Sequence, residues 1–201
     1  MESFFGRRIH FVGVGGISMS ALARFAIQQG AVVSGSDGVD SALIDELRCI
    51  GAKIVIGVDI SVVENCDTVV FSSAIKPTHP EIVEAHRLNL QVFERHEFLG
   101  QIASQFETVV AVAGTHGKTT VTAMIAHILK SLSVSFLANI GGIASGLSNY
   151  VQNGEDIQLF VAEACEYKQS LLSLKPSIGV VTNIECDHPD CYESLDAITA
   201  V

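Results

Sequence analysis

The stretch TVVAVAGTHGKTT, residues 108–120, decides the fold that we predict for this chain of 201 residues. Its first six residues form a largely apolar run of strand length, which is typical of a strand buried on both faces of a sheet. Gly114 and Gly117 then permit a tight turn, and a helix-length pattern follows over residues 118–132. A strand, a glycine turn and a helix in this order predict a parallel α/β sheet.

The turn itself carries the residues that phosphoryl transfer needs. Its glycines let the backbone approach phosphate groups, and Lys118 supplies a positive charge to the β- and γ-phosphates. The hydroxyl of Thr119 can bind Mg²⁺, and the dipole of the following helix favours an anion. A strict Walker A loop would have a glycine at the position of Val112, so this loop is shorter than the general pattern.

Strand-length and helix-length runs alternate along the rest of the chain. The predicted strands cover residues 9–14, 31–35, 54–56, 67–71, 92–93, 108–113, 157–162 and 178–181. The predicted helices cover residues 19–29, 41–50, 80–88 and 118–132, and a further helical stretch ends near Ser104. We therefore predict an α/β protein with a Rossmann-like parallel-sheet domain over residues 1–106 and a second, P-loop-type domain over residues 107–201.

A second glycine turn follows the first predicted strand. The backbone around Gly13, Gly15 and Gly16 lies where a doubly wound sheet binds a nucleotide diphosphate. Ser18 stands where the dinucleotide fingerprint has its third glycine, and Asp37 stands where a ribose-binding acid is expected. These residues predict a nucleotide in this crevice. A nicotinamide-dependent oxidoreductase, and a tight turn that binds no ligand, remain the alternatives.

Composition narrows the classes of partner and location. The 22 acidic residues outnumber the 12 basic ones, which disfavours a nucleic-acid surface. No apolar run has the length of a membrane helix, and glycines interrupt the N-terminal apolar stretch, so we expect neither membrane insertion nor a signal peptide. The five cysteines have no framework spacing, and we expect free thiols in the cytoplasm.

Several separated motifs resemble those of the Mur ligase family, the amide ligases of peptidoglycan precursor synthesis. AGTHGKTT at residues 113–120 is similar to the ATP loop of that family, including its compressed glycine spacing. IHFVGVGGISMS at 9–20, SGSD at 34–37, SSAI at 72–75 and ERHEFL at 94–99 extend the resemblance over essentially the whole chain. The second domain is therefore expected to be the central ATPase domain of a Mur ligase.

The resemblance implies a two-step reaction that uses ATP and Mg²⁺. ATP would phosphorylate the lactyl carboxylate of UDP-N-acetylmuramic acid, and the amine of L-alanine would then displace phosphate from the acyl phosphate. The first glycine turn would hold the UDP diphosphate, which accounts for the absent third glycine. A related ligase that adds a preformed peptide in cell-wall recycling, and a non-catalytic nucleotide-binding fragment, remain alternatives.

The resemblance also assigns roles to individual residues. Those expected to bind ATP are Gly114, Thr115, His116, Gly117, Lys118, Thr119 and Thr120. Those expected to bind the UDP-sugar are Gly13, Gly15, Gly16, Asp37, Ser72, Ser73 and Arg95. Thr119, Glu163 and His188 are the expected Mg²⁺ ligands, and with Lys118 they form the expected catalytic set. Glu166 is the alternative to Glu163 as a metal ligand.

Members of this family have a third, C-terminal domain that contributes to the ATP and amino-acid sites. We therefore expect this chain to hold the first domain and an incomplete second domain, with no C-terminal domain and no ligase activity by itself. We also expect an exposed apolar face in its C-terminal half.

Overall fold

The computed structural model describes residues 4–142, 146–165 and 167–185. It divides the chain into two compact units, Met1–Phe98 and Leu99–Val201. Each unit is built on a five-stranded sheet with helices packed against it, which confirms the predicted α/β fold class. The domain boundary at residues 106 and 107 stays a prediction.

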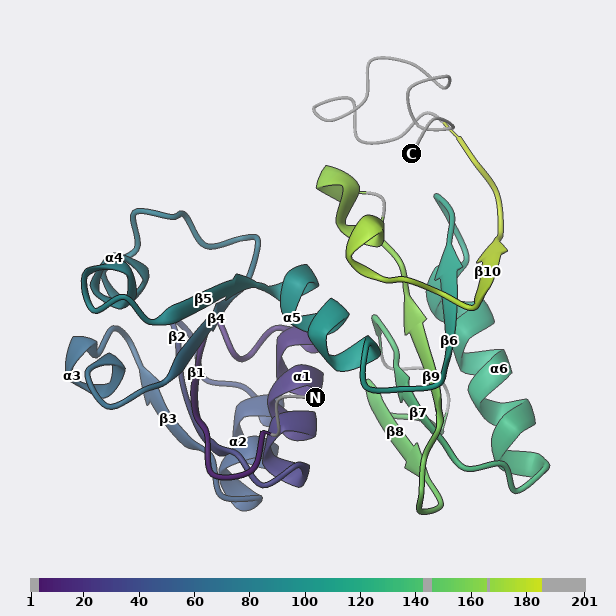
Figure 1. Cartoon of the computed structure of the whole chain (residues 1–201), viewed down its shortest axis with the longest axis horizontal. Helices are drawn as coiled ribbons and strands as arrows, with labels where there is room; N and C mark the ends of the chain where they lie inside the picture. The colour runs from purple at the N-terminus through teal and green to yellow at the C-terminus, as the bar shows by residue number, and fades with distance from the viewer. Residues whose placement is uncertain (1–3, 143–145, 166, 186–201) are drawn as a thin grey trace. The chain divides into compact units, whose positions relative to one another are not determined.

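The first unit has a parallel sheet with strand order β3-β2-β1-β4-β5. Its strands are β1 (Arg8–Val12), β2 (Val32–Asp37), β3 (Lys53–Ile56), β4 (Thr68–Phe71) and β5 (Gln91–Glu94). Its helices are α1 (Ile17–Gln28), α2 (Ala42–Cys49), α3 (Ile60–Val63) and α4 (Pro80–Arg87), and α5 (Arg95–Ala103) begins at its end. Helices α1 and α2 lie on one face of this sheet and α3 and α4 on the other (Figure 1).

The central strand β1 determines where a ligand can bind in this unit. It pairs with β2 on one side and with β4 on the other, so the order of the strands reverses at β1. Ligands of open parallel sheets bind at such a reversal, outside the carboxyl ends of the strands. The glycine turn that follows Val12 therefore lies at the position where this architecture builds a binding crevice.

Apolar side chains fill both faces of this sheet. Phe11 is fully buried, and its ring packs edge-on against Phe98 with ring centroids 5.6 Å apart. Val12 points to the opposite face, where it packs in a buried cluster with residues of β4 and α4. His10, which directly precedes Phe11 in β1, is 1% exposed although its side chain is polar. A buried polar group in a strand needs a partner, and its partners are described below.

The second unit has a mixed sheet with strand order β10-β6-β9-β7-β8. Its strands are β6 (Thr108–Ala113), β7 (Phe136–Asn139), β8 (Tyr150–Asn153), β9 (Leu159–Glu163) and β10 (Ile178–Val181). Helix α6 (Lys118–Ser131) covers one face, and η1 (Tyr167–Ser173) precedes β10. All pairs are parallel except β7 with β8, so the predicted parallel sheet carries one antiparallel edge strand.

The predicted strands and helices are found within two residues of their expected ends, but β7, β8, α3 and η1 were not predicted. The elements β7, β8 and α3 have four residues each, which is too short for a clear periodic pattern. Residues 136–139 and 150–153 are stabilised as strands by pairing with each other, and β7 also pairs with β9. Tertiary pairing, rather than local propensity, therefore determines this part of the sheet.

One face of α6 carries apolar side chains that are more than half exposed in the described part of the chain. Met124, Ile128 and Leu132 follow at intervals of four residues and are 57%, 56% and 67% exposed. This spacing places them on the same face of the helix. Among the described residues, no helix has the length and apolar character needed to cross a membrane.

Candidate functional site

The glycine turn of the first unit forms one wall of a cavity of about 580 Å³. This volume lies in the range of small-molecule binding sites. Five of the predicted UDP-sugar residues line it: Gly13, Gly15, Gly16, Asp37 and Ser72. The remaining wall comes from the loops after β2, β3 and β4, as expected for a crevice at the carboxyl edge of a parallel sheet.

Two predicted residues of this site lie outside the cavity wall. Ser73 is exposed beside Ser72. Arg95, at the start of α5, donates from Nη1 to the hydroxyl of Ser18 over 3.2 Å. Ser18 is the residue that replaces the third glycine of the dinucleotide fingerprint, so its hydroxyl supplies an acceptor for the arginine that a glycine would lack.

Asp37 braces the glycine turn. Its Oδ2 accepts the backbone N–H of Gly15 at 2.8 Å, and its Oδ1 accepts the backbone N–H of Val39 at 3.2 Å. The carbonyl of Ser36 accepts the N–H groups of Gly13 and Val14 at 2.8 and 3.1 Å. The end of β2 therefore holds the glycine turn in place through three hydrogen bonds, and the bond to Val39 orders the loop after β2. The role predicted for Asp37 at a ribose stays a prediction.

Substitution of Asp37 by asparagine is expected to weaken the predicted binding of a UDP-sugar by about tenfold or more. An amide offers one acceptor oxygen in place of two, so one of the two backbone amides loses a charge-assisted bond worth about 1.5–3 kcal/mol. Isothermal titration calorimetry of the 201-residue chain measures the effect.

Asp45→Asn is the matched control for this prediction. Asp45 lies outside the cavity wall, is 71% exposed, and its carboxylate pairs with Arg48 Nη1 at 3.0 Å. Because surface ion pairs contribute little, the control is expected to bind the sugar nucleotide as the wild type does. Equal losses in both variants would contradict the bracing role of Asp37.

In the second unit, the predicted ATP loop connects the end of β6 to the start of α6. Gly114 and Gly117 have φ angles of +127° and +82°, which favour glycine. Gly117 is the N-terminal cap of α6, and the first-turn amides of residues 118–120 have no acceptor within the helix. These amides and the helix dipole make this end of α6 suited to phosphate.

The segment 182–185, which follows β10, holds this loop from the side. Asn183 Oδ1 accepts the N–H of His116 at 2.9 Å, and its Nδ2 donates to the carbonyl of His116 at 3.0 Å. The backbone carbonyl of Asn183 also accepts the N–H of Thr115 at 3.1 Å. The amides of Thr115 and His116 are thus engaged by Asn183, so the predicted contacts to phosphate would come from the residues from Gly117 onward.

Thr182 and Glu185 add further contacts to the same loop. Thr182 Oγ1 donates to the carbonyl of His116 at 2.6 Å, and the N–H of Glu185 donates to Thr115 Oγ1 at 2.9 Å. Neither Thr182 nor Asn183 was predicted from the sequence to contact this loop. The only feature of the sequence that could have identified these two residues is their position directly after a predicted strand of the parallel sheet.

Lys118 folds back over the loop. Its Nζ donates to the carbonyls of Gly114 and Thr115 at 2.5 and 3.2 Å. These bonds hold the ammonium beside the backbone of the loop, where a phosphate would also lie. An anion bound in the loop would be expected to replace these neutral carbonyls as the acceptor of the Lys118 ammonium, because a hydrogen bond between two charged groups is stronger.

Glu163 lies at the same sheet edge as the loop. It ends β9, directly beside Val112 of β6. Its Oε1 accepts the backbone N–H of Gly141 at 2.6 Å, and a Cβ on Gly142 would stand 3.1 Å from the methyl group of Thr119. The loop after β7 therefore lies between Glu163 and Thr119, and its two glycines leave room at this point.

The oxygen donors of Thr119 and Glu163 have the hard chemistry that Mg²⁺ prefers, so these residues fit the predicted ion. His188 and Glu166 lie outside the described residues. Within residues 4–142, 146–165 and 167–185, no three His, Cys, Asp or Glu side chains gather as a metal site. The set of Thr119, Glu163 and His188 stays a prediction.

Two family models match the chain. The model of the Mur ligase family, catalytic domain, matches residues 8–107, and that of the Mur ligase middle domain matches residues 112–201. A UDP-N-acetylmuramate–L-alanine ligase of Clostridium beijerinckii is 43% identical over 192 residues, which are 96% of this chain and 42% of that protein. One of Clostridium acetobutylicum is 39% identical over 198 residues, 98% of this chain and 43% of the relative. The chain thus spans less than half the length of these curated relatives.

Solved structures similar to this chain are also ligases that have UDP-N-acetylmuramate in their names. The structure of UDP-N-acetylmuramate–alanine ligase from Thermotoga maritima superposes on this chain with a TM-score of 0.87 and is 32% identical in sequence. The match covers 96% of this chain and 45% of the Thermotoga chain. UDP-N-acetylmuramate:L-alanyl-γ-D-glutamyl-meso-diaminopimelate ligase of Neisseria meningitides has a TM-score of 0.86 at 27% identity, over 97% of this chain and 66% of its own.

Proposed function

The chain belongs to the Mur ligase family, and on this premise we propose that it serves an ATP-dependent ligase that joins L-alanine to the lactyl carboxylate of UDP-N-acetylmuramic acid. In this proposal the first unit binds the sugar nucleotide, and the second unit binds ATP. The observation that carries it is the presence of Lys118, Thr119 and Glu163 at one edge of the second sheet. The names of the curated relatives support the choice of substrates.

The proposed chemistry has two steps. A carboxylate oxygen of the lactyl group attacks the γ-phosphorus of ATP, and ADP leaves. The amine of L-alanine then attacks the carbonyl carbon of the acyl phosphate, phosphate leaves, and the amine loses a proton. Lys118 would neutralise charge on the transferred phosphoryl group, and the first-turn amides of α6 would orient it. Mg²⁺ at Thr119 and Glu163 would supply further charge neutralisation when bound.

Phosphate release tests the proposal. A ligase that contains these 201 residues is expected to release phosphate from ATP only when UDP-N-acetylmuramic acid and L-alanine are both present. A coupled phosphate assay with each substrate omitted in turn measures this dependence. Release that does not depend on the sugar nucleotide would contradict the substrate assignment, and turnover by the 201-residue chain alone would contradict the expectation that it has no ligase activity by itself.

A ligase for a preformed peptide is the second candidate, because the Neisseria structure has a nearly equal TM-score. The same assay with L-alanyl-γ-D-glutamyl-meso-diaminopimelate in place of L-alanine separates the two. The higher identity to the alanine ligase of Thermotoga favours L-alanine. A cytoplasmic location remains the prediction made from the cysteine pattern.

A further inference from the structure

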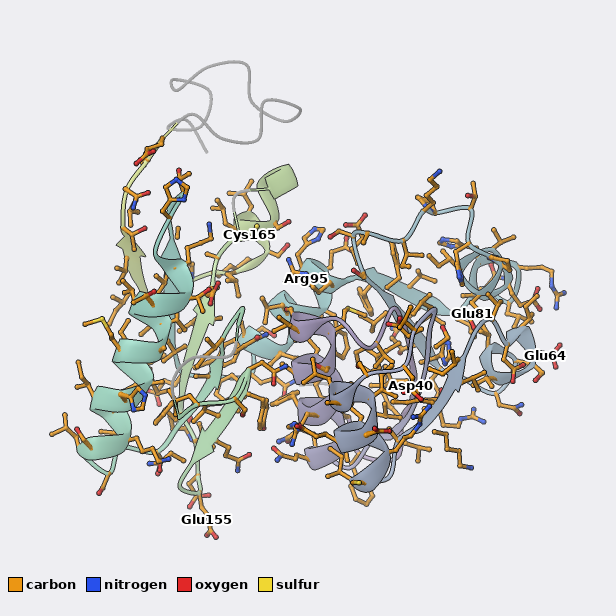
Figure 2. The ribbon with its side chains drawn as sticks, turned by 180° about the vertical axis from the view of Figure 1, so that it is seen from behind. Asp40, Glu64, Glu81, Arg95, Glu155 and Cys165 are labelled. Atoms are coloured by element: carbon orange, nitrogen blue, oxygen red, sulfur yellow. The ribbon has the colours of Figure 1, made fainter. Side chains whose placement is uncertain are left out.

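A buried carboxylate lies beneath the cavity of the first unit. Glu81, in the first turn of α4, is 0% exposed. Figure 2 labels its side chain at the inner side of α4, facing the sheet. A helix N-terminus favours a carboxylate, but complete burial of a charge is costly unless its oxygens accept hydrogen bonds. Glu81 therefore requires partners, and most of them belong to the wall of the cavity or to the segments next to it.

Each oxygen of Glu81 accepts a hydrogen bond from a different segment. Oε2 accepts the hydroxyl of Ser36 at 2.5 Å, and Ser36 lines the cavity at the end of β2. Oε1 accepts the backbone N–H of Asp59 at 2.9 Å, directly after the cavity residues Gly57 and Val58. One carboxylate thus connects the end of β2 with the loop that follows the neighbouring strand β3.

Two imidazoles complete the surroundings of this carboxylate. His10 Nε2 lies 3.6 Å and His79 Nδ1 lies 3.7 Å from Glu81 Oε2, within ion-pair distance but beyond a hydrogen bond. His79 lines the cavity, and His10 is held from its other side by Ser34 Oγ at 2.9 Å from Nδ1. Burial alone would raise the pKa of Glu81, but the interactions with His10, Ser36 and the Asp59 amide outweigh it and hold this pKa below its usual value.

We propose that Glu81 is a positioning residue for the sugar-nucleotide site, which fixes Ser36, the loop at residues 57–59 and His79 in the arrangement that binds the ligand. The inference rests on the proposed function. Glu81 does not line the cavity itself, so it acts through residues that do. An ordinary structural carboxylate would stabilise the fold without setting the affinity of the folded protein for its ligand.

Glu81→Gln separates these two roles. The amide keeps the size of the side chain but replaces one acceptor oxygen with a donor, so either Ser36 or the Asp59 amide loses its partner. Titration calorimetry of the 201-residue chain with UDP-N-acetylmuramic acid is expected to give a Kd raised about tenfold, with an unchanged stoichiometry. A merely structural role would lower the melting temperature or the stoichiometry and leave the Kd within twofold of the wild type, and that result would overturn the inference.

Two further variants complete the test. Glu84→Gln changes the same residue type one turn later on α4, where the carboxylate pairs with Arg87 on the surface, and it is expected to bind as the wild type does. Ser36→Ala should fold even if Glu81→Gln does not, and it should raise the Kd several-fold. In the double variant the two losses should not add, because both remove the same contact. Wild-type affinity in Ser36→Ala, or additive losses, would overturn the inference. A wild-type chain that binds no sugar nucleotide would contradict the proposed function itself, and this inference with it.

Discussion

Replacement of Lys118 by alanine is expected to lower ATP-dependent acyl-phosphate formation by about 100- to 1,000-fold, while binding of the UDP-sugar is unchanged. Removal of one group that stabilises developing charge has an effect of this order. Lys118 lies in the loop of the second unit, whereas the glycine turn and its cavity lie in the first. The measurements are acyl-phosphate trapping in a ligase that contains this chain, and calorimetry with UDP-N-acetylmuramic acid.

Lys130→Ala is the control for this prediction. Lys130 lies in the last turn of α6, is exposed, and carries the same charge as Lys118. A loss that comes from net charge or from helix propensity would affect both variants alike, so acyl-phosphate formation should stay normal in the control. An equal loss of UDP-sugar affinity and acyl-phosphate formation in Lys118→Ala would contradict the separation of the two sites.

Gly114→Ala is expected to reduce ATP use by about 100-fold, because a Cβ at this position displaces the phosphate loop. The φ angle of +127° is one that L-residues rarely adopt, and a Cβ would stand 2.8 Å from the carbonyl oxygen of Asn183. The strain costs about 1–3 kcal/mol, and the collision with segment 182–185 adds a similar amount. Thermal unfolding and phosphate release report the two consequences.

Gly117→Ala is the control that introduces backbone strain without a collision. Gly117 also has a positive φ, of +82°, but a Cβ there meets nothing within 4 Å. This variant is expected to lose about 1–2 kcal/mol through its backbone and to retain more ATP use than Gly114→Ala. If the two variants behave alike, segment 182–185 does not determine the shape of the loop.

The sequence predicted the positions of the glycine turns because their requirements are local. A largely apolar run such as residues 108–113 indicates a buried strand, and a glycine directly after it indicates a turn with positive φ. Proline at the first position of α4 likewise marks where that helix begins. Strand-end residues such as Asp37 and Glu163 could therefore be assigned to the carboxyl edge of a sheet.

The contacts that hold each site together were not predictable in this way. Glu81 has the pattern of an exposed acid in the first turn of a helix, yet the structure buries it against Ser36, 45 residues earlier. Asn183 has no motif that connects it to His116, 67 residues away. Pairing over such distances depends on which strands become neighbours, and no local propensity encodes that order.

The sequence by itself determined the α/β class, the two glycine turns and the motifs that resemble a Mur ligase, because each depends on residues close together along the chain. The tertiary structure decided which side chains meet around those turns. Asp37 and Glu81 bond to residues of the cavity wall, and Asn183 bonds to the loop between β6 and α6, since parallel strands distant in sequence end at the same edge of a sheet. The physical reason is that periodicity and backbone conformation are local properties, whereas burial and hydrogen-bond partners are set by the packing of the whole unit.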